Sequence, residues 1–271
     1  VKVSPLCLGC MNFGQPTDEK ESIQIIHQAM EAGINFLDTA NVYNHGVSEE
    51  IVGKAIKGRR DCVVLATKVH GKMGEGPNDK GNSRYHIMQQ VEASLKRLQT
   101  SHIDLYQLHR PDPDTPIDEQ LAALDNLVRQ GKVLYIGTST FPAWQLCETL
   151  WVSERSNHAR FVCEQPPYNI FGRSIERNLL PFCRRFGTAV IPWSPLAGGW
   201  LTGKYRKGQE PPENSRFARR GKDWDSPEVQ NKLDKVEELI PLAEEHDASL
   251  SQFALAWMLA NPVVTSPIIG P

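Results

Sequence analysis

The sequence has no long hydrophobic run and no excess of charge of one sign, and each absence excludes a class of protein. No apolar stretch approaches the roughly 20 residues that span a bilayer, so no membrane partner is predicted. The formal net charge of −2 over 271 residues gives no global attraction for nucleic acid or an acidic membrane surface. The 40% hydrophobic content suffices for one large core or two modest ones.

Cysteine is also scarce, with six in the chain. Four of them fall in or beside predicted strands and helices, which is typical of reduced core thiols and predicts a cytoplasmic protein. Cys7 and Cys10 have metal-ligand spacing, but no second such pair and no paired histidines accompany them. The sequence therefore predicts no metal site.

Short apolar runs alternate with helical patterns along the chain. The helices include a stretch from about Glu19 to Ala32 that Gly33 ends, and one that begins at Thr115-Pro116, with Thr115 as the expected cap and Pro116 as the first helical residue. The strand-like runs begin near Val3, Phe36, Val63, Ile103, Val133, Phe161, Thr188 and Val263. This alternation predicts an α/β fold, a (β/α)8 TIM barrel formed by one domain over residues 1–271. A doubly wound sheet is the alternative, although the segment from Gly9 to Gly14 lacks the middle glycine of a dinucleotide fingerprint.

The alternation is interrupted once, after the seventh predicted strand. A basic loop covers 205–226 and contains Pro211-Pro212 but few apolar residues, so we expect it to be mobile without a ligand. Two extra helices, at about 227–246 and 249–260, follow it. A shorter polar loop covers 70–82. Both loops are expected to lie over the carboxyl ends of the strands.

Four polar residues lie at or just beyond the ends of consecutive apolar runs. Asp38, Lys68 and His109 each end such a run, and Tyr43 follows Asp38 by five positions. Each has an ordinary structural explanation by itself: a cap, a solvated lysine, a half-buried aromatic residue or a core histidine. Their coincidence at three successive strand ends favours one site, because barrel enzymes carry their chemistry there.

The four side chains form a plausible set for transferring a proton. A free tyrosine titrates near pH 10, and an adjacent ammonium group favours the phenolate and lowers that pKa. We therefore expect Tyr43 to donate a proton, Lys68 to tune it, Asp38 to hold Lys68, and His109 to orient the oxygen that receives the proton. A carbonyl that accepts hydride on carbon and a proton on oxygen needs this arrangement and no metal.

Three segments resemble the aldo-keto reductases. They are GINFLDTANVY at 33–43, ATK at 66–68 and DLYQLH at 104–109. The resemblance extends over nearly the whole chain and is strongest to the bacterial-type branch that includes the potassium-channel β-subunits. It implies a barrel that binds NADP(H) across the carboxyl ends of its strands and reduces a small-molecule carbonyl substrate. Asp38, Tyr43, Lys68 and His109 match the four catalytic positions.

The resemblance also implies a set of cofactor contacts. Gln165 and Ser139 would bind the nicotinamide carboxamide, Thr140 replaces the usual Asn there, and Trp193 would stack on the ring. Arg216 would meet the adenosine phosphates or, alternatively, be a solvated loop charge. The full set is Gly9, Cys10, Met11, Asp38, Ser139, Thr140, Gln165, Trp193, Ser194, Pro195, Leu196, Gly198, Gly199, Lys204, Arg216 and Gly270.

The end of the chain departs from the family pattern. The segment 268–271 matches the last strand, but the basic residue and the final helix that usually grip the 2′-phosphate are missing from the sequence. Both ends are interpreted as trimmed, since the chain begins at Val1 without Met. The sequence therefore leaves the preference between NADP and NAD undetermined.

Three other functions are compatible with parts of the sequence. The pattern Gly198-x4-Gly203-Lys204 is similar to a P-loop, but Tyr205 takes the position of the magnesium-binding Ser or Thr. A lysine at a strand end also suits a Schiff-base enzyme. A regulatory, β-subunit-like protein with weak turnover is the main alternative to the enzyme. The sequence does not specify the carbonyl substrate or the oligomeric state, although Trp144, Tyr168, Phe171 and Trp224 are candidates for an apolar pocket.

Overall fold

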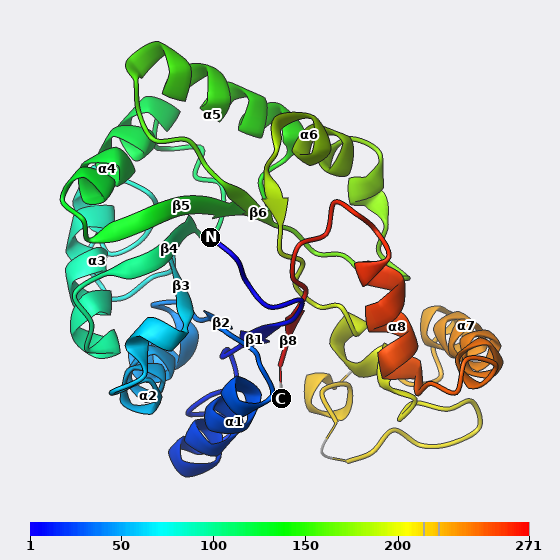
Figure 1. Ribbon diagram of the computed structural model, residues 1–271. Coiled ribbons are helices and arrows are strands. Elements are labelled where there is room, and N and C mark those ends of the chain that lie inside the picture. The colour runs from blue at the N-terminus through cyan, green and yellow to red at the C-terminus, as the bar shows by residue number, and fades with distance from the viewer. Residues whose placement is uncertain (214, 222, 271) are drawn as a thin grey trace.

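Eight short parallel strands form one sheet whose neighbours follow chain order (Figure 1). The computed structural model describes residues 1–213, 215–221 and 223–270; Lys222 of the basic loop and Pro271 lie outside them. The strands are β1 (Cys7–Gly9), β2 (Phe36–Asp38), β3 (Val64–Val69), β4 (Ile103–Leu108), β5 (Val133–Ser139), β6 (Cys163–Gln165), β7 (Ala189–Val190) and β8 (Ile268–Ile269).

The sheet closes on itself. β8 pairs with β1, and on its other side the chain meets β7 through a parallel bridge between Val190 and Val264. The amide of Thr265 donates to Val190 O at 2.8 Å, and the amide of Ile268 donates to Pro192 O at 2.8 Å. The prediction of a (β/α)8 barrel is confirmed. The doubly wound alternative is wrong, because in an open sheet β7 and the segment that leads into β8 would not be hydrogen-bonded to each other.

The first and last strands begin later than the sequence pattern indicated, at Cys7 and Ile268 rather than near Val3 and Val263. At the amino end, Ser4 and Asn35 exchange side-chain to backbone hydrogen bonds of 2.6 and 3.1 Å, which replace ladder bonds there. At the carboxyl end, Pro267 has no N–H to donate, so a regular ladder begins only after it.

The helices surround the barrel in chain order and run back along its outside (Figure 1). Their ends have local causes. Asp18 caps the first helix by accepting from the Glu21 amide, and Gly33 follows its end with φ of 91°. The helices are α1 (Glu19–Glu31), α2 (Val47–Ala55), α3 (Arg84–Leu98), α4 (Ile117–Arg129), α5 (Ala143–Ser156), α6 (Leu179–Phe186), α7 (Pro227–Glu244) and α8 (Leu250–Leu259).

The expected cap of α4 is wrong by one position. Pro116 is the cap and Ile117 the first helical residue. The hydroxyl of Thr115 is directed at Asp112 instead, donating to Oδ2 at 2.9 Å, and no side chain caps the helix. Within the described part of the chain, none of these helices combines the length and apolar character needed to cross a membrane.

Alternate residues of the strands point into the barrel and form layers. Cys7, Phe36, Leu105, Cys163 and Ile191 belong to one buried apolar cluster. Side chains two positions apart in a strand lie on the same face. Two positions after Phe36, Leu105 and Cys163, the strands β2, β4 and β6 therefore place three polar side chains in the interior: Asp38, Gln107 and Gln165. Lys68 joins them, because it lies opposite Gln107 in the register of β3 and β4. A polar layer thus lies above an apolar one.

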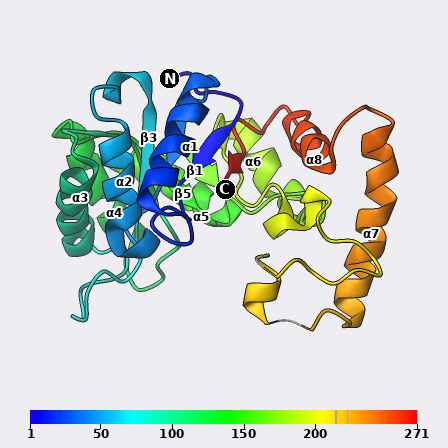
Figure 2. The ribbon, with the colours of Figure 1, turned by 90° about the horizontal axis from the view of Figure 1, so that it is seen from below.

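The two extra helices after β7 are present, as α7 and α8, and α7 stands farthest from the barrel (Figure 2). The basic loop that precedes them is better anchored than its composition indicated. Tyr205, Phe217 and Trp224 pack around Trp200, with ring centroids 4.9 to 5.9 Å from that indole. The expectation of few apolar anchors was wrong, since three widely spaced aromatic residues converge only in the folded chain.

Candidate active site

Lys68 is the centre of the predicted constellation. Its ammonium donates to Asp38 Oδ1 at 2.5 Å, to Thr39 O at 2.8 Å and to the Tyr43 hydroxyl at 3.2 Å. The side chain is fully buried. Burial lowers the pKa of Lys68, but Asp38 and Tyr43 outweigh this effect and leave the pKa above its ordinary value. Lys68 is therefore charged at neutral pH, with all three of its donors used.

Tyr43 opens the short helix η1 (Tyr43–Gly46), just beyond the end of β2. This position lets its hydroxyl reach Lys68 from outside the polar layer. Burial raises the pKa of Tyr43, and the Lys68 ammonium offsets only part of the rise. The net direction is opposite to the one expected from the sequence. Tyr43 is accordingly protonated at neutral pH, as a proton donor must be.

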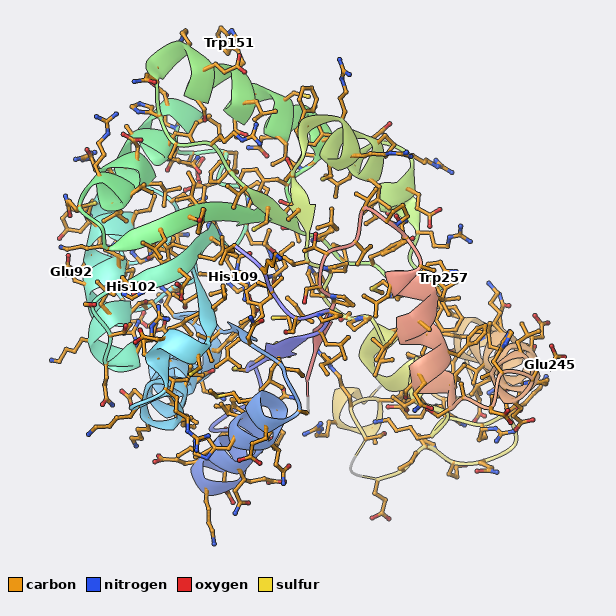
Figure 3. All side chains as sticks on the ribbon, in the orientation of Figure 1. Glu92, His102, His109, Trp151, Glu245 and Trp257 are labelled. Carbon is orange, nitrogen blue, oxygen red and sulfur yellow. The ribbon has the colours of Figure 1, made fainter. Side chains whose placement is uncertain are left out.

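His109 completes the group at the end of β4. Its ring meets that of Tyr43 edge to face, with centroids 5.6 Å apart, and its amide donates to Val69 O at 2.8 Å. Figure 3 shows His109 among the strands at the centre of the molecule. Burial, followed by the charges of Lys68 and Arg110, lowers the pKa of His109 to about 2. The imidazole is therefore neutral and can orient an oxygen by a hydrogen bond without carrying charge.

Asp38 accepts hydrogen bonds from two residues besides Lys68, the one partner that its predicted role required. Oδ1 bonds Lys68, while Oδ2 accepts from Gln107 Nε2 at 3.1 Å and from Gln165 Nε2 at 2.9 Å. Gln107 was not identified as a site residue, although it occupies the inward position between Leu105 and His109 in β4. A polar residue on the buried face of a strand was the available signal.

The predicted nicotinamide contacts lie beside this layer. Ser139 ends β5 and donates to Gln165 O at 2.9 Å, and the Thr140 hydroxyl donates to Ser139 O at 2.7 Å. Thr140 has φ of 61°, in the left-handed region. Trp193 lies two positions beyond the buried Ile191, so it falls on the inward face where a ring could stack. Ser139 and Thr140 are connected to Asp38 through Gln165, whose backbone oxygen accepts from the Ser139 hydroxyl and the Thr140 amide and whose side chain donates to Asp38.

Four predicted contacts lie where β1 meets β8, and two of them, Cys10 and Gly9, have structural roles as well. The Cys10 amide donates to Asp38 O at 2.8 Å, and its buried thiol faces Leu8 O, so the thiol does not point toward the site. A Cβ on Gly9 would lie 2.6 Å from the Ile268 side chain, which shows that glycine allows β1 and β8 to pair. Met11 is 42% exposed, and Gly270 ends the described chain beside Gly9.

The segment after β7 forms a tight turn bordered by two cations. Ser194, Ala197, Gly198 and Gly199 all have positive φ, between 52° and 101°, and Pro195 and Leu196 lie within the same turn. A Cβ on Gly199 would lie 2.9 Å from Lys204 Cε, and one on Gly198 would lie 4.0 Å from Arg216 Cδ. Glycine therefore leaves the backbone open beside both cations, which suits a phosphate group.

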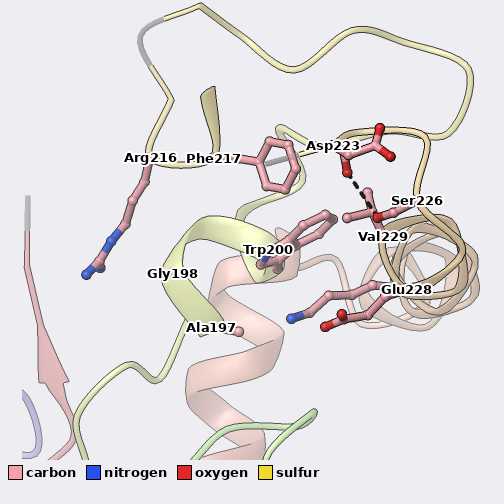
Figure 4. A pocket seen from close by; sticks show the side chains of 10 residues that line it. Ala197, Gly198, Trp200, Arg216, Phe217, Asp223, Ser226, Glu228 and Val229 are labelled. Carbon is pink, nitrogen blue, oxygen red and sulfur yellow. Dashed lines mark hydrogen bonds between the residues drawn. The ribbon is translucent and has the colours of Figure 1, made fainter. Parts of the chain in front are cut away.

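Arg216 and its neighbour Phe217 point in opposite directions (Figure 4). Both residues line a cavity of about 320 Å³ beside Trp200. The Phe217 ring turns toward Trp200, whereas the guanidinium end of Arg216 extends toward the strand at the left of Figure 4. The predicted contact between Arg216 and the adenosine phosphates stays a prediction.

The four aromatic residues expected to line one apolar pocket do not all come together. Trp144 is 68% exposed on α5, and Tyr168 is buried against Trp257, with centroids 5.3 Å apart. Trp224 and Phe171, by contrast, both pack against the loop cluster around Trp200. The prediction of a shared pocket was wrong, because residues from four separate loops and helices carry no periodic pattern that relates them.

The structure fits a Schiff-base enzyme and a P-loop nucleotide site less well. Lys68 is charged and saturated with acceptors, which makes it a poor Schiff-base nucleophile. Tyr205 is fully buried in the aromatic cluster and unavailable to a magnesium ion. Among the described residues, no group of three His, Cys, Asp or Glu side chains could hold a metal.

The comparison with known families identifies the family of the chain. The model of the aldo/keto reductase family matches residues 5–271. The chain belongs to this family, and it is an oxidoreductase of the aldo-keto reductase type.

The relatives of this chain include proteins named as enzymes and proteins named as channel subunits. The chain is 45% identical to an uncharacterized oxidoreductase, YrpG, of Bacillus subtilis, and 42% identical to a probable voltage-gated potassium channel subunit beta of Arabidopsis thaliana. It is 36% identical to versiconal hemiacetal acetate reductase of Aspergillus parasiticus. Each alignment covers 100% of this chain, and 84%, 84% and 85% of the respective relatives.

Proposed function

We propose that this protein reduces an aldehyde or ketone to an alcohol with NADPH, taking the proton from Tyr43. The observation that carries the proposal is the buried chain from Asp38 through Lys68 to the Tyr43 hydroxyl, with bonds of 2.5 and 3.2 Å. It places a neutral acid, held by a fixed cation, at the carboxyl end of a barrel.

The reduced nicotinamide, when bound, supplies hydride to the carbonyl carbon. The protein supplies the rest. His109 and Tyr43 orient the carbonyl oxygen by hydrogen bonds, and Tyr43 passes its proton to that oxygen as negative charge develops. Lys68 stabilises the resulting phenolate, and Asp38 keeps Lys68 charged and in place.

The residues around the site fit a dinucleotide. Ser139, Thr140, Gln165 and Trp193 would hold the nicotinamide, and the turn that contains Gly198 and Gly199 would face its phosphates, with Lys204 and Arg216 at either side. Gly9, Cys10, Met11 and Gly270 would contact it through the β1–β8 edge. The fit rests on the open backbone at the glycine turn beside two cations.

Turnover with a panel of carbonyl compounds tests the proposal. NADPH oxidation should accelerate with at least one class among sugar aldehydes, aromatic aldehydes and ketones, and the matching alcohol should form in equal amount. NADPH that binds without oxidation across the panel would contradict the enzyme and support the second candidate, a cofactor-binding regulatory subunit. The 42% identity to a probable channel subunit beta is the observation in favour of that candidate.

The pH dependence should reflect Tyr43 and Lys68 but not His109. Both Tyr43 and Lys68 have pKa values above their ordinary ones, so both stay protonated until alkaline pH. The pKa of His109 is about 2, so its charge does not change near neutrality. We expect kcat for reduction to be flat from about pH 5.5 to 9 and to fall only above that range. An acidic limb near pH 6.5 that His109→Gln removes would contradict this assignment.

Trp193 should report cofactor binding by fluorescence. If it stacks on the nicotinamide, NADPH should quench the emission, and Trp193→Ala should weaken binding and remove most of the quenching. Trp144→Phe is the matched control, since Trp144 is exposed on α5 and should not sense the ligand. Full quenching in Trp193→Ala would show that another tryptophan is the reporter.

Arg216 should discriminate between the two dinucleotides. NADPH carries one phosphate more than NADH, so Arg216→Ala should weaken NADPH by about tenfold, weaken NADH less, and speed NADPH release. Arg219→Ala, an exposed arginine of the same loop, is the control and should change neither. An equal loss for both cofactors in stopped-flow binding would assign Arg216 to the solvated surface.

A further inference from the structure

Two glutamine side chains and Asp38 form a closed triangle within the polar layer. Gln107 and Gln165 each donate an Nε2 hydrogen to Asp38 Oδ2, at 3.1 and 2.9 Å. Gln165 Nε2 also donates to Gln107 Oε1 at 3.2 Å. All three side chains are buried, with at most 3% exposed. The triangle joins β2, β4 and β6 across the barrel interior.

The charge on Asp38 fixes the orientation of both amides. An ionised carboxylate only accepts, so each glutamine must turn its NH₂ group toward Oδ2. Gln107 then presents its carbonyl oxygen to Gln165 and takes up the second hydrogen of Gln165 Nε2. Rotating the Gln165 amide by 180° would place its oxygen against two acceptors, which is costly in a buried site.

The fold makes room for this arrangement. Gln107 lies opposite Lys68 on one side and opposite Gly137 of β5 on the other. A Cβ on Gly137 would approach Gln107 Cγ to 3.2 Å and Cys163 Sγ to 2.5 Å. Glycine at 137 therefore leaves the space that the Gln107 side chain needs to reach Asp38.

We propose that Gln107 is a positioning residue that sets which chemical group the cofactor site accepts beside Gln165. Both Nε2 hydrogens of Gln165 are used within the triangle, so only Gln165 Oε1 remains to meet a ligand. An oxygen acceptor selects a ligand that donates there. A carboxamide NH₂ meets this requirement, and a carboxylate at the same place is rejected, because it would face Gln165 Oε1 with a second acceptor.

The same triangle connects ligand recognition to proton transfer. Asp38 Oδ2 is held by the two amides, while Asp38 Oδ1 holds Lys68, which bonds Tyr43. Loss of the Gln107 donor should therefore loosen Asp38 as well as Gln165. This inference rests on the proposed function, because it names the nicotinamide carboxamide as the group that Gln165 meets.

Equilibrium binding without turnover tests the inference. The probes are NADP⁺ and nicotinic acid adenine dinucleotide phosphate, which carries a carboxylate in place of the carboxamide. The wild type should bind NADP⁺ at least about tenfold tighter than the acid analogue. In Gln107→Met, one Gln165 hydrogen is released toward the ligand, so this ratio should fall to within about threefold. The kcat for carbonyl reduction should also fall by about tenfold as Asp38 loosens.

Gln120→Met is the matched control. Gln120 is fully buried in α4 and bonds Thr115 O at 2.7 Å and Asn82 at 3.1 Å, outside the barrel interior. It should lower the unfolding temperature and leave the binding ratio unchanged. Gln107→Leu replaces Gln107→Met if the latter does not fold. An unchanged ratio in a folded Gln107 variant of an active enzyme would overturn the inference alone, whereas a wild type inactive with every carbonyl would contradict the proposed function.

Discussion

Tyr43→Phe should lower kcat for carbonyl reduction by about 10²-fold or more, with little change in the affinity for NADPH. The substitution removes only the hydroxyl that donates the proton. The phenyl ring can keep its edge-to-face contact with His109, and the hydroxyl is not among the predicted cofactor contacts. Steady-state kinetics and cofactor titration measure the two effects separately.

Tyr106→Phe provides the control for this substitution. Tyr106 is fully buried in β4, and its hydroxyl has no hydrogen-bond partner in the described structure. Removing that hydroxyl should be neutral or slightly stabilising and should leave kcat unchanged, since an unpaired buried hydroxyl costs free energy. Near-normal turnover in Tyr43→Phe would show that another group supplies the proton.

Lys68→Met should reduce kcat by a similar factor and should also destabilise the fold. The reduction in kcat follows because Lys68 contributes most of the stabilisation of the Tyr43 phenolate, with a smaller contribution from Arg110. The loss of stability follows because Asp38 would remain buried without its counter-ion, and breaking such a pair typically costs about 3–5 kcal/mol. Thermal or denaturant unfolding, measured alongside turnover, detects both changes.

The double variant Asp38→Asn with Lys68→Met separates catalysis from stability. A neutral amide at 38 removes the uncompensated charge, so most of the lost unfolding free energy should return while kcat stays low. If kcat returned together with stability, Lys68 would be a structural residue only. If neither variant differed from the wild type in stability, the buried ion pair would contribute nothing measurable to the fold.

The sequence by itself predicted that the four side chains proposed for catalysis lie together, and the reason is geometric. In a parallel barrel the carboxyl ends of all strands lie at one face. A polar residue at the end of an apolar run is therefore expected at that face. Asp38, Lys68 and His109 obey this rule, and Tyr43 is close enough to Asp38 in the chain to join them. The number and order of the strands followed from the same runs.

Other features depended on contacts between residues far apart in the chain. The starts of β1 and β8 were decided by the Ser4–Asn35 bonds and by Pro267, and neither changes the apolar pattern. The aromatic residues of the long loop anchor it only because Trp200 lies where they converge.

The electrostatics of the site also required the fold. A lysine brought next to Tyr43 at the strand ends predicts a lowered pKa for Tyr43, but burial dominates and raises that pKa. Burial likewise makes His109 neutral. Sequence determined which ionisable groups this protein brings to the barrel face, because strand ends are readable from local pattern. Tertiary structure alone decided their protonation and the role of Gln107, because desolvation and cross-barrel hydrogen bonds arise only when distant strands enclose the same space.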